Sequence, residues 1–135
     1  IHFTRKQRYI TFMAIVNKVN KKVKTSKDEV IKYQILTYCF LNNIQISSSD
    51  LNCLAELAKV GSKELTSFCK EISKKKIFKS SQSCRNALAK AEKKNLIIKN
   101  GSNKKTIYIN SDLNIQTEGI ILLDYKILGI ETKES

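Results

Sequence analysis

Apolar residues recur at intervals of three and four along the first half of the chain, a spacing that predicts helices with one buried face. The first helix is predicted over residues 26–42, where Ser26 and Glu29 form a capping box. Two more are predicted over 50–60 and 62–76, and a short strand at 44–46. The residues expected to face the core in the three helices are Val30, Ile31, Ile35, Leu36, Cys39, Phe40, Leu51, Leu54, Leu57, Ala58, Leu65, Phe68, Cys69 and Ile72.

Residues 80–110 form one further pattern of helix, strand, turn and strand. Two serines can cap the helix, and Asn95 can end it because Asn tolerates the left-handed conformation. Residues 96–98 and 106–109 are predicted strands on either side of the turn cluster 100–103. The expected inner face of this helix is Cys84, Ala87, Leu88 and Ala91.

The two ends of the chain carry apolar segments of their own. Residues 1–25 are basic around an apolar centre, and we expect a helical arm there, with a strand as the alternative. Such an arm could lie along DNA, dimerise, bind an anionic membrane, or simply pack on the domain. Residues 113–135 include an alternating run that predicts a strand or a short helix, covered by its own domain or by a second subunit. The expected organisation is an arm (1–25), a central domain (26–112) and a C-terminal extension (113–135).

The pattern over residues 80–110 resembles the second half of a winged helix-turn-helix domain. The segment SQSCRNALAKAEKKNLI is similar to the recognition helix of that family, which begins with small polar residues and ends in an apolar pair before the wing. Asn95 stands where the family usually has Gly, and Ala91 where it usually has Leu. The resemblance covers 26–112 and implies an α+β, mostly helical fold. Because four helices are predicted where a minimal winged helix has three, we expect one extra helix.

The resemblance also implies binding to double-stranded DNA, with this helix in the major groove and the wing on the backbone. Arg can bond guanine and Asn can bond adenine through two hydrogen bonds each. The expected base-reading residues are Gln82, Ser83, Arg85 and Asn86, and the expected phosphate contacts are Ser81, Lys75, Lys76, Lys90, Lys93, Lys104 and Lys105.

Two classes of function follow. The segment TIYINSDL after the wing is similar to phage and plasmid replication initiators, so we expect a transcriptional regulator or a replication initiator of a phage or mobile element. The alternative is a non-enzymatic structural or protein-interaction component of a larger assembly, for example a viral one, that uses a winged helix as a binding module. A homodimer or larger assembly through the arm or the C-terminal segment is compatible with both.

The charge distribution favours a polyanionic partner. The formal net charge is +13, with 22 Lys and only 3 Arg, a bias that an A/T-rich genome can produce by itself. Codon bias would spread Lys evenly, however, whereas residues 1–27 hold eight basic and no acidic residues and residues 62–112 hold 13 basic and 4 acidic. The basic charge is therefore concentrated in the arm and in the helix-wing region.

Catalytic and cofactor signals are missing from the sequence. The four cysteines form no CxxC pair, the one histidine is His2, and no glycine-rich phosphate-binding motif occurs. We therefore expect no enzyme, metal or cofactor, four buried cysteines, and an intracellular setting. No run of 18 apolar residues occurs, so no membrane span is expected.

Overall fold

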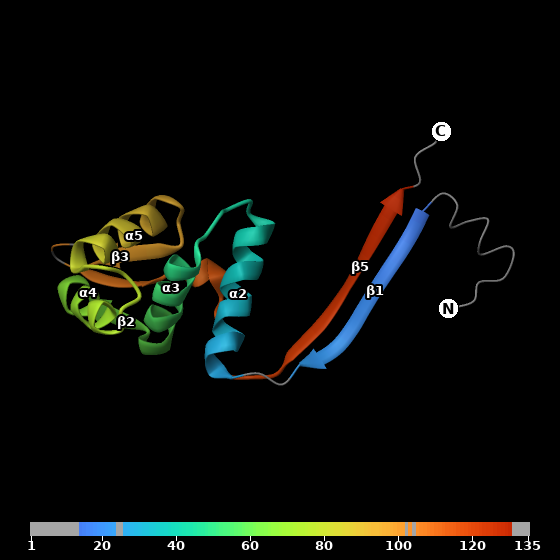
Figure 1. The fold of residues 1–135 in the computed structure, drawn as a ribbon, viewed down its shortest axis with the longest axis horizontal. Helices are drawn as coiled ribbons and strands as arrows, with labels where there is room; N and C mark the ends of the chain where they lie inside the picture. Colours follow the sequence, from blue (N-terminus) through green and yellow to red (C-terminus); the bar gives the residue numbers. More distant parts are fainter. Residues whose placement is uncertain (1–13, 24–25, 102, 104, 131–135) are drawn as a thin grey trace, which may run out of the picture. The chain divides into compact units, whose positions relative to one another are not determined.

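A computed structural model describes residues 14–23, 26–101, 103 and 105–130 of the chain. The chain divides into two compact units (Figure 1). The central unit comprises Thr25–Gly119, and the second unit comprises the two ends of the chain, Ile1–Lys24 and Ile120–Ser135.

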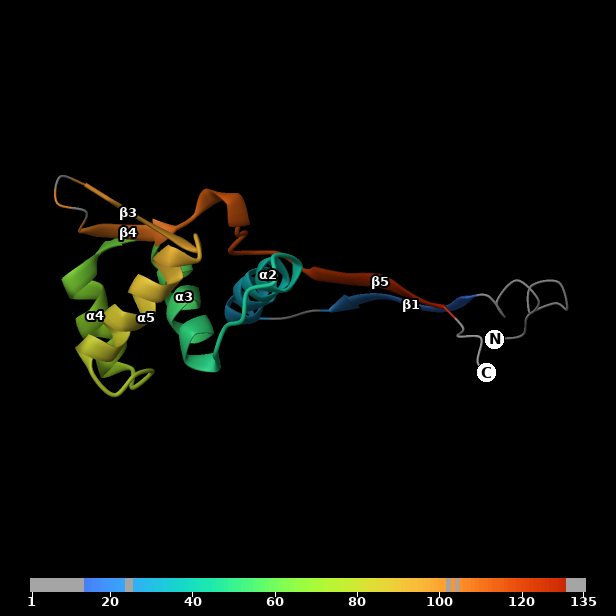
Figure 2. The same ribbon diagram turned by 90° about the horizontal axis from the view of Figure 1, so that it is seen from above.

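The central unit is α+β, with four helices and a small antiparallel sheet. Its three strands lie in the order β2-β4-β3. Figure 2 shows the β3–β4 hairpin along one side of helices α3, α4 and α5. The elements are α2 (Lys27–Leu41), α3 (Ser48–Val60), β2 (Ser62–Glu64), α4 (Leu65–Lys74), α5 (Ser81–Lys93), β3 (Ile97–Asn100), β4 (Thr106–Ile109) and the 3-10 helix η1 (Ser111–Leu113).

Serine caps fix where helices α2, α3 and α5 begin, at Ser26, Ser47 and Ser80. The predicted capping box of α2 is confirmed, because the Glu29 N–H donates to Ser26 Oγ and the Ser26 N–H donates to Glu29 Oε1, both at 3.2 Å. The Ser80 hydroxyl accepts from the Ser83 N–H at 3.1 Å and starts α5 in the same way. The left-handed conformation expected for Asn95 is also confirmed, with φ 62. Four helices are present between residues 26 and 95, as predicted.

The third strand of the sheet is not where the sequence predicted it. Residues 44–46 form no strand, and the Ile44 N–H instead donates to the Cys39 carbonyl at 2.8 Å, just after α2 ends. The strand is β2, which pairs with β4 from Ser62↔Tyr108 to Glu64↔Thr106. The helix predicted from residue 62 consequently begins at Leu65, where the Glu64 carboxylate accepts from the Ser67 N–H at 2.8 Å.

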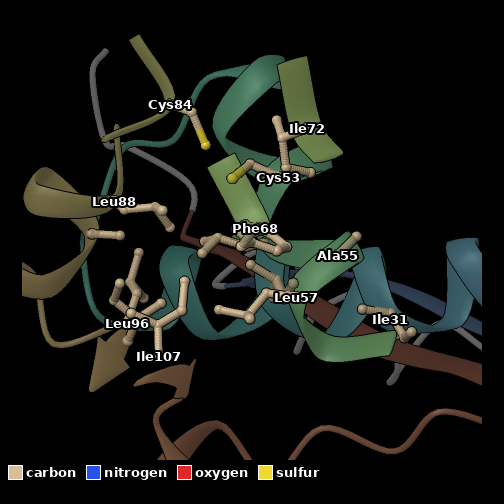
Figure 3. Packing of buried hydrophobic residues seen from close by; sticks show 14 of the residues in the cluster. Ile31, Cys53, Ala55, Leu57, Phe68, Ile72, Cys84, Leu88, Leu96 and Ile107 are labelled. Carbon is tan, nitrogen blue, oxygen red and sulfur yellow. The ribbon is translucent and has the colours of Figure 1, made fainter. Parts of the chain in front are cut away.

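The core gathers apolar side chains from all four helices and from the sheet. Figure 3 shows Phe68 of α4 between Leu88 of α5 and Leu57 of α3. All four cysteines are free and buried, as expected. The predicted inner face of α2 is wrong at two positions, since Leu36 is 43% and Phe40 is 84% exposed. The buried residues of that helix are Val30, Ile31, Ile35 and Cys39.

The second unit contains a two-stranded antiparallel ribbon, formed by β1 (Ala14–Val23) and β5 (Ile121–Ile130). Its register runs from Ala14↔Ile130 to Val23↔Ile121. The helical arm is therefore wrong for residues 14–23, where the strand alternative holds, and the rest of that prediction lies outside the described residues. For the C-terminal segment the strand alternative is confirmed. Two segments that were predicted separately, one near each end of the chain, thus pair with each other in one sheet.

Candidate nucleic-acid interface

Helix α5 presents one row of polar side chains to solvent along its whole length. The exposed residues of the helix are Gln82, Asn86, Lys90 and Lys93, at successive spacings of four, four and three. Residues at these spacings lie on one face of a helix. The one acidic residue of α5, Glu92, is half-buried, and its carboxylate lies 3.5 Å from Lys99 Nζ. The row therefore consists of two amides followed by two cations.

The two amides of this row are bonded to each other. Gln82 Nε2 donates to Asn86 Oδ1 at 2.9 Å, one helical turn further on. An amide oxygen has two lone pairs, and Asn86 Nδ2 keeps its two donors. Asn86 thus retains one acceptor position and one donor group side by side, which is the pair that the major-groove edge of adenine requires.

Arg85 lies beside this row and is directed to α4. Its Nη2 donates to Thr66 Oγ1 at 2.8 Å, and the residue is half-buried. One of the five N–H donors of the guanidinium is therefore occupied, and the group is held against the first turn of α4. Thr66 was not among the predicted site residues, because only the packing of α4 on α5 brings together two residues that are 19 positions apart.

Two predicted contact residues, Ser81 and Ser83, have partners inside the protein. Ser81 Oγ lies 3.2 Å from Ser73 Oγ, which joins the end of α4 to the beginning of α5. Ser83 Oγ lies 3.1 Å from the hydroxyl of the capping residue Ser80. The Ser81 hydroxyl therefore contributes to the connection between α4 and α5, and the Ser83 hydroxyl to the cap of α5.

The predicted phosphate-binding lysines are not equivalent. Lys76, Lys90, Lys93 and Lys105 are exposed and make no ion pair with any described residue. The Lys105 carbonyl accepts from the Leu65 N–H at 2.6 Å, so the residue directly before β4, at the turn of the β3–β4 hairpin, is joined to the start of α4. Lys104 lies outside the described residues.

Lys75 differs because its ammonium pairs with the Glu56 carboxylate of α3 at 2.5 Å. Burial raises the pKa of Glu56. Hydrogen bonds from Lys75 and Lys59 lower it by more than burial raises it, so the pKa of Glu56 is below its usual value. Glu56 is thus ionised at neutral pH and compensates the Lys75 charge. Of the predicted lysines with described side chains, Lys75 is the least available to an anion.

The cysteine thiols near the candidate interface are protonated and poor nucleophiles. A hydrogen bond with Cys53 and burial raise the pKa of the Cys84 thiol, and mainly burial raises the pKa of Cys69 to about 12. Because the thiolate is the reactive form, these protonated thiols are poor nucleophiles at neutral pH. Within the described residues, no three His, Cys, Asp or Glu side chains are grouped so that they could hold a metal ion.

Comparisons of the chain with protein-family models, with curated proteins and with solved structures found no significant match. In the part of the chain that the structure describes, no helix combines the length and the apolar character needed to cross a membrane.

Proposed function

We propose that this chain is a winged-helix protein that binds double-stranded DNA, as a transcriptional regulator or a replication initiator. The order of elements from α3 to β4 supports this assignment: helix, strand, helix, helix, strand, strand, with the first strand added to the hairpin. In this proposal α4 and α5 are the helix-turn-helix pair, the β3–β4 hairpin is the wing, and α2 is the extra helix. The Gln34 side chain of α2 bonds the backbone N–H and carbonyl of Gln116, both at 2.6 Å, which ties α2 to the segment after η1.

The observation that carries the proposal is the exposed row of α5. A helix that enters the major groove needs short polar side chains that reach base edges, and cations that reach phosphates. Gln82 and Asn86 are the first kind, Lys90 and Lys93 are the second, and no acidic side chain interrupts the row. The hydrogen bond from Arg85 to Thr66 orients the guanidinium before DNA arrives, which lowers the entropic cost of using it.

A titration of labelled duplex DNA at low salt, followed by fluorescence anisotropy, tests the proposal. We expect binding by the wild-type chain, and weaker binding by Lys90→Ala. Lys27→Ala is the matched control, because Lys27 is also exposed on a helix and makes no ion pair with any described residue, but belongs to α2. The proposal is wrong if the wild-type chain does not bind duplex DNA at low salt, or if both substitutions weaken binding equally.

One surface of α2 favours the second candidate, a component of a larger assembly. Tyr33, Leu36 and Phe40 are 45%, 43% and 84% exposed, and they recur at spacings of three and four. Exposed apolar rows of this kind mark contact surfaces for other proteins. This candidate predicts no duplex binding at low salt. The DNA-binding proposal instead predicts duplex binding that Phe40→Ser leaves unchanged.

A further inference from the structure

The ribbon leaves one edge of β5 without a partner strand among the described residues. In this sheet β5 has only β1 beside it, so its other edge presents free backbone donors and acceptors. The strand is long for an edge, with ten residues, and carries Leu122, Tyr125, Ile127 and Leu128 at exposures of 45–67%. A sheet of two strands is only marginally stable in water, and natural proteins rarely leave such an edge open.

The sequence of β5 is complementary to itself when it is reversed about Tyr125. In an antiparallel pairing with Tyr125 opposite its own copy, Asp124 falls opposite Lys126 and Lys126 falls opposite Asp124. The next positions pair residues 123 with 127 and 122 with 128, and all four residues are apolar. Asp124 and Lys126 are both exposed in the single chain. Opposite charges and apolar residues facing each other across strands stabilise an antiparallel pair.

From this complementarity we infer that a second copy of the chain pairs with β5. The two β5 strands are antiparallel with the two-fold axis at Tyr125, and together they form a four-stranded sheet in the order β1-β5-β5-β1. Such a contact is isologous, because the same edge is used by both copies. It concerns the ribbon alone and does not depend on DNA binding by the central unit.

The other edge of the ribbon does not offer the same complementarity. Strand β1 carries Lys18, Lys21 and Lys22 and no acidic residue, so pairing with its own copy would bring like charges together. The register of the ribbon also places Lys18 opposite Lys126, a like-charge pair. In the dimer, Lys126 would lie between Lys18 of β1 and Asp124 of the second copy, and the Asp124 carboxylate would offset the repulsion between the two lysines. The charges therefore select β5 over β1 as the edge that meets the second copy.

Charge reversal tests the pairing. The mass of the full chain is measured by sedimentation equilibrium over a range of concentrations, and we expect a dimer of twice the 15.4 kDa monomer. Asp124→Lys or Lys126→Asp alone creates two like-charge pairs in the dimer, and each should raise the dissociation constant roughly tenfold. The double variant Asp124→Lys, Lys126→Asp restores opposite charges and should restore the dimer. A monomer at every concentration, single variants as tight as wild type, or a double variant that stays monomeric would each overturn the inference.

Cysteine cross-linking tests the register independently. Directly opposed residues of antiparallel strands have Cα atoms about 4.5–5.5 Å apart, within the range of a disulfide. Tyr125→Cys should therefore form a covalent dimer in oxidised glutathione. In Leu122→Cys, the control, the two new thiols are six residues apart along the paired strands, roughly 20 Å, and should not react. The inference is wrong if Leu122→Cys cross-links as readily as Tyr125→Cys, or if neither variant does. Circular dichroism of each variant verifies that the helices of the central unit are intact.

Discussion

Replacing Lys90 and Lys93 by alanine removes two cations from the exposed row of α5 without touching its buried face. Cys84, Leu88 and Ala91, which pack on the core, are unchanged. Alanine has the highest helix propensity, so the helix persists, with a loss of a few tenths of a kcal/mol from weaker interaction with the helix dipole. A change in DNA binding therefore reports the two charges and not the fold.

The expected size of the effect comes from counting available lysines. Lys75 is left out of the count because Glu56 pairs with it, so the proposed phosphate contacts are Lys76, Lys90, Lys93 and Lys105 together with Lys104, which lies outside the described residues. With about five phosphates neutralised, log K falls with log salt at a slope near −4.5, and without Lys90 and Lys93 the slope is near −2.7. Between 50 and 200 mM salt, the affinity of the wild type then falls about 500-fold and that of the variant about 40-fold.

The assay is an anisotropy titration of one random-sequence duplex at four salt concentrations, with Lys27→Ala as the control. Lys27→Ala should keep the wild-type slope. If the double variant also keeps it, these two lysines do not contact phosphates, and the orientation assigned to α5 is wrong.

Three further outcomes can be measured. Arg85→Lys should weaken binding to a selected DNA site by about 1–3 kcal/mol and binding to random DNA by little, because an ammonium cannot replace the planar guanidinium of arginine. An equal loss of affinity for both duplexes in a competition titration argues against base reading by Arg85. Leu57→Ala should lower the free energy of unfolding by about 2–5 kcal/mol in urea, whereas Leu36→Ala should cost under about 1 kcal/mol, since Leu57 is 0% and Leu36 is 43% exposed; equal costs would contradict the assigned core. Hydrogen bonds from Lys32 and Lys59 lower the pKa of Asp28 below its usual 3.8. The ionised Asp28 therefore stabilises the folded state above pH 3.8, and this stabilisation is lost as the pH falls through the pKa of the folded state. After discounting for solvent screening, this contribution is at most about 1 kcal/mol, and Asp28→Asn should flatten the profile of unfolding free energy against pH below about pH 4.

Local signals in the sequence were sufficient for the helix caps and for the β3–β4 hairpin. Ser26 with Glu29, Ser80, and Asn95 act through neighbours within a few residues, so their roles follow from chemistry that the sequence displays. For α5, the predicted contact residues Gln82, Asn86, Lys90 and Lys93 are exposed in one row, whereas the predicted base readers Ser83 and Arg85 are half-buried.

Features that depend on distant partners could not be predicted. Strand β2 is only Ser62–Glu64, has no apolar residue, and is a strand only because β4 pairs with it. Ile44 and Ile46 had the better strand pattern, but they pack on the core as a loop. The contact between Arg85 and Thr66 likewise depends on how α4 packs on α5.

The pairing of β1 with β5 at the two ends of the chain also depends on a distant partner. The apolar run in residues 1–25 fits both a helix and a strand, and the presence of β5 decides for the strand. The pairing joins residues about 100 positions apart, and no short-range pattern records such a partner. Leu36 and Phe40 were wrongly predicted to be buried because each directly follows a buried residue of α2. Neighbouring positions of a helix point in different directions, so the core-facing stripe of α2 includes Ile35 and Cys39 but not the residues after them.

Amide chemical-shift changes during titration with duplex DNA show residue by residue whether the exposed row of α5 contacts the duplex. We expect the largest shift changes at Gln82, Asn86, Lys90 and Lys93 of α5 and at Lys105 in the turn of the hairpin, with none along the exposed face of α2. Changes concentrated on that face of α2, with α5 unaffected, would contradict this prediction.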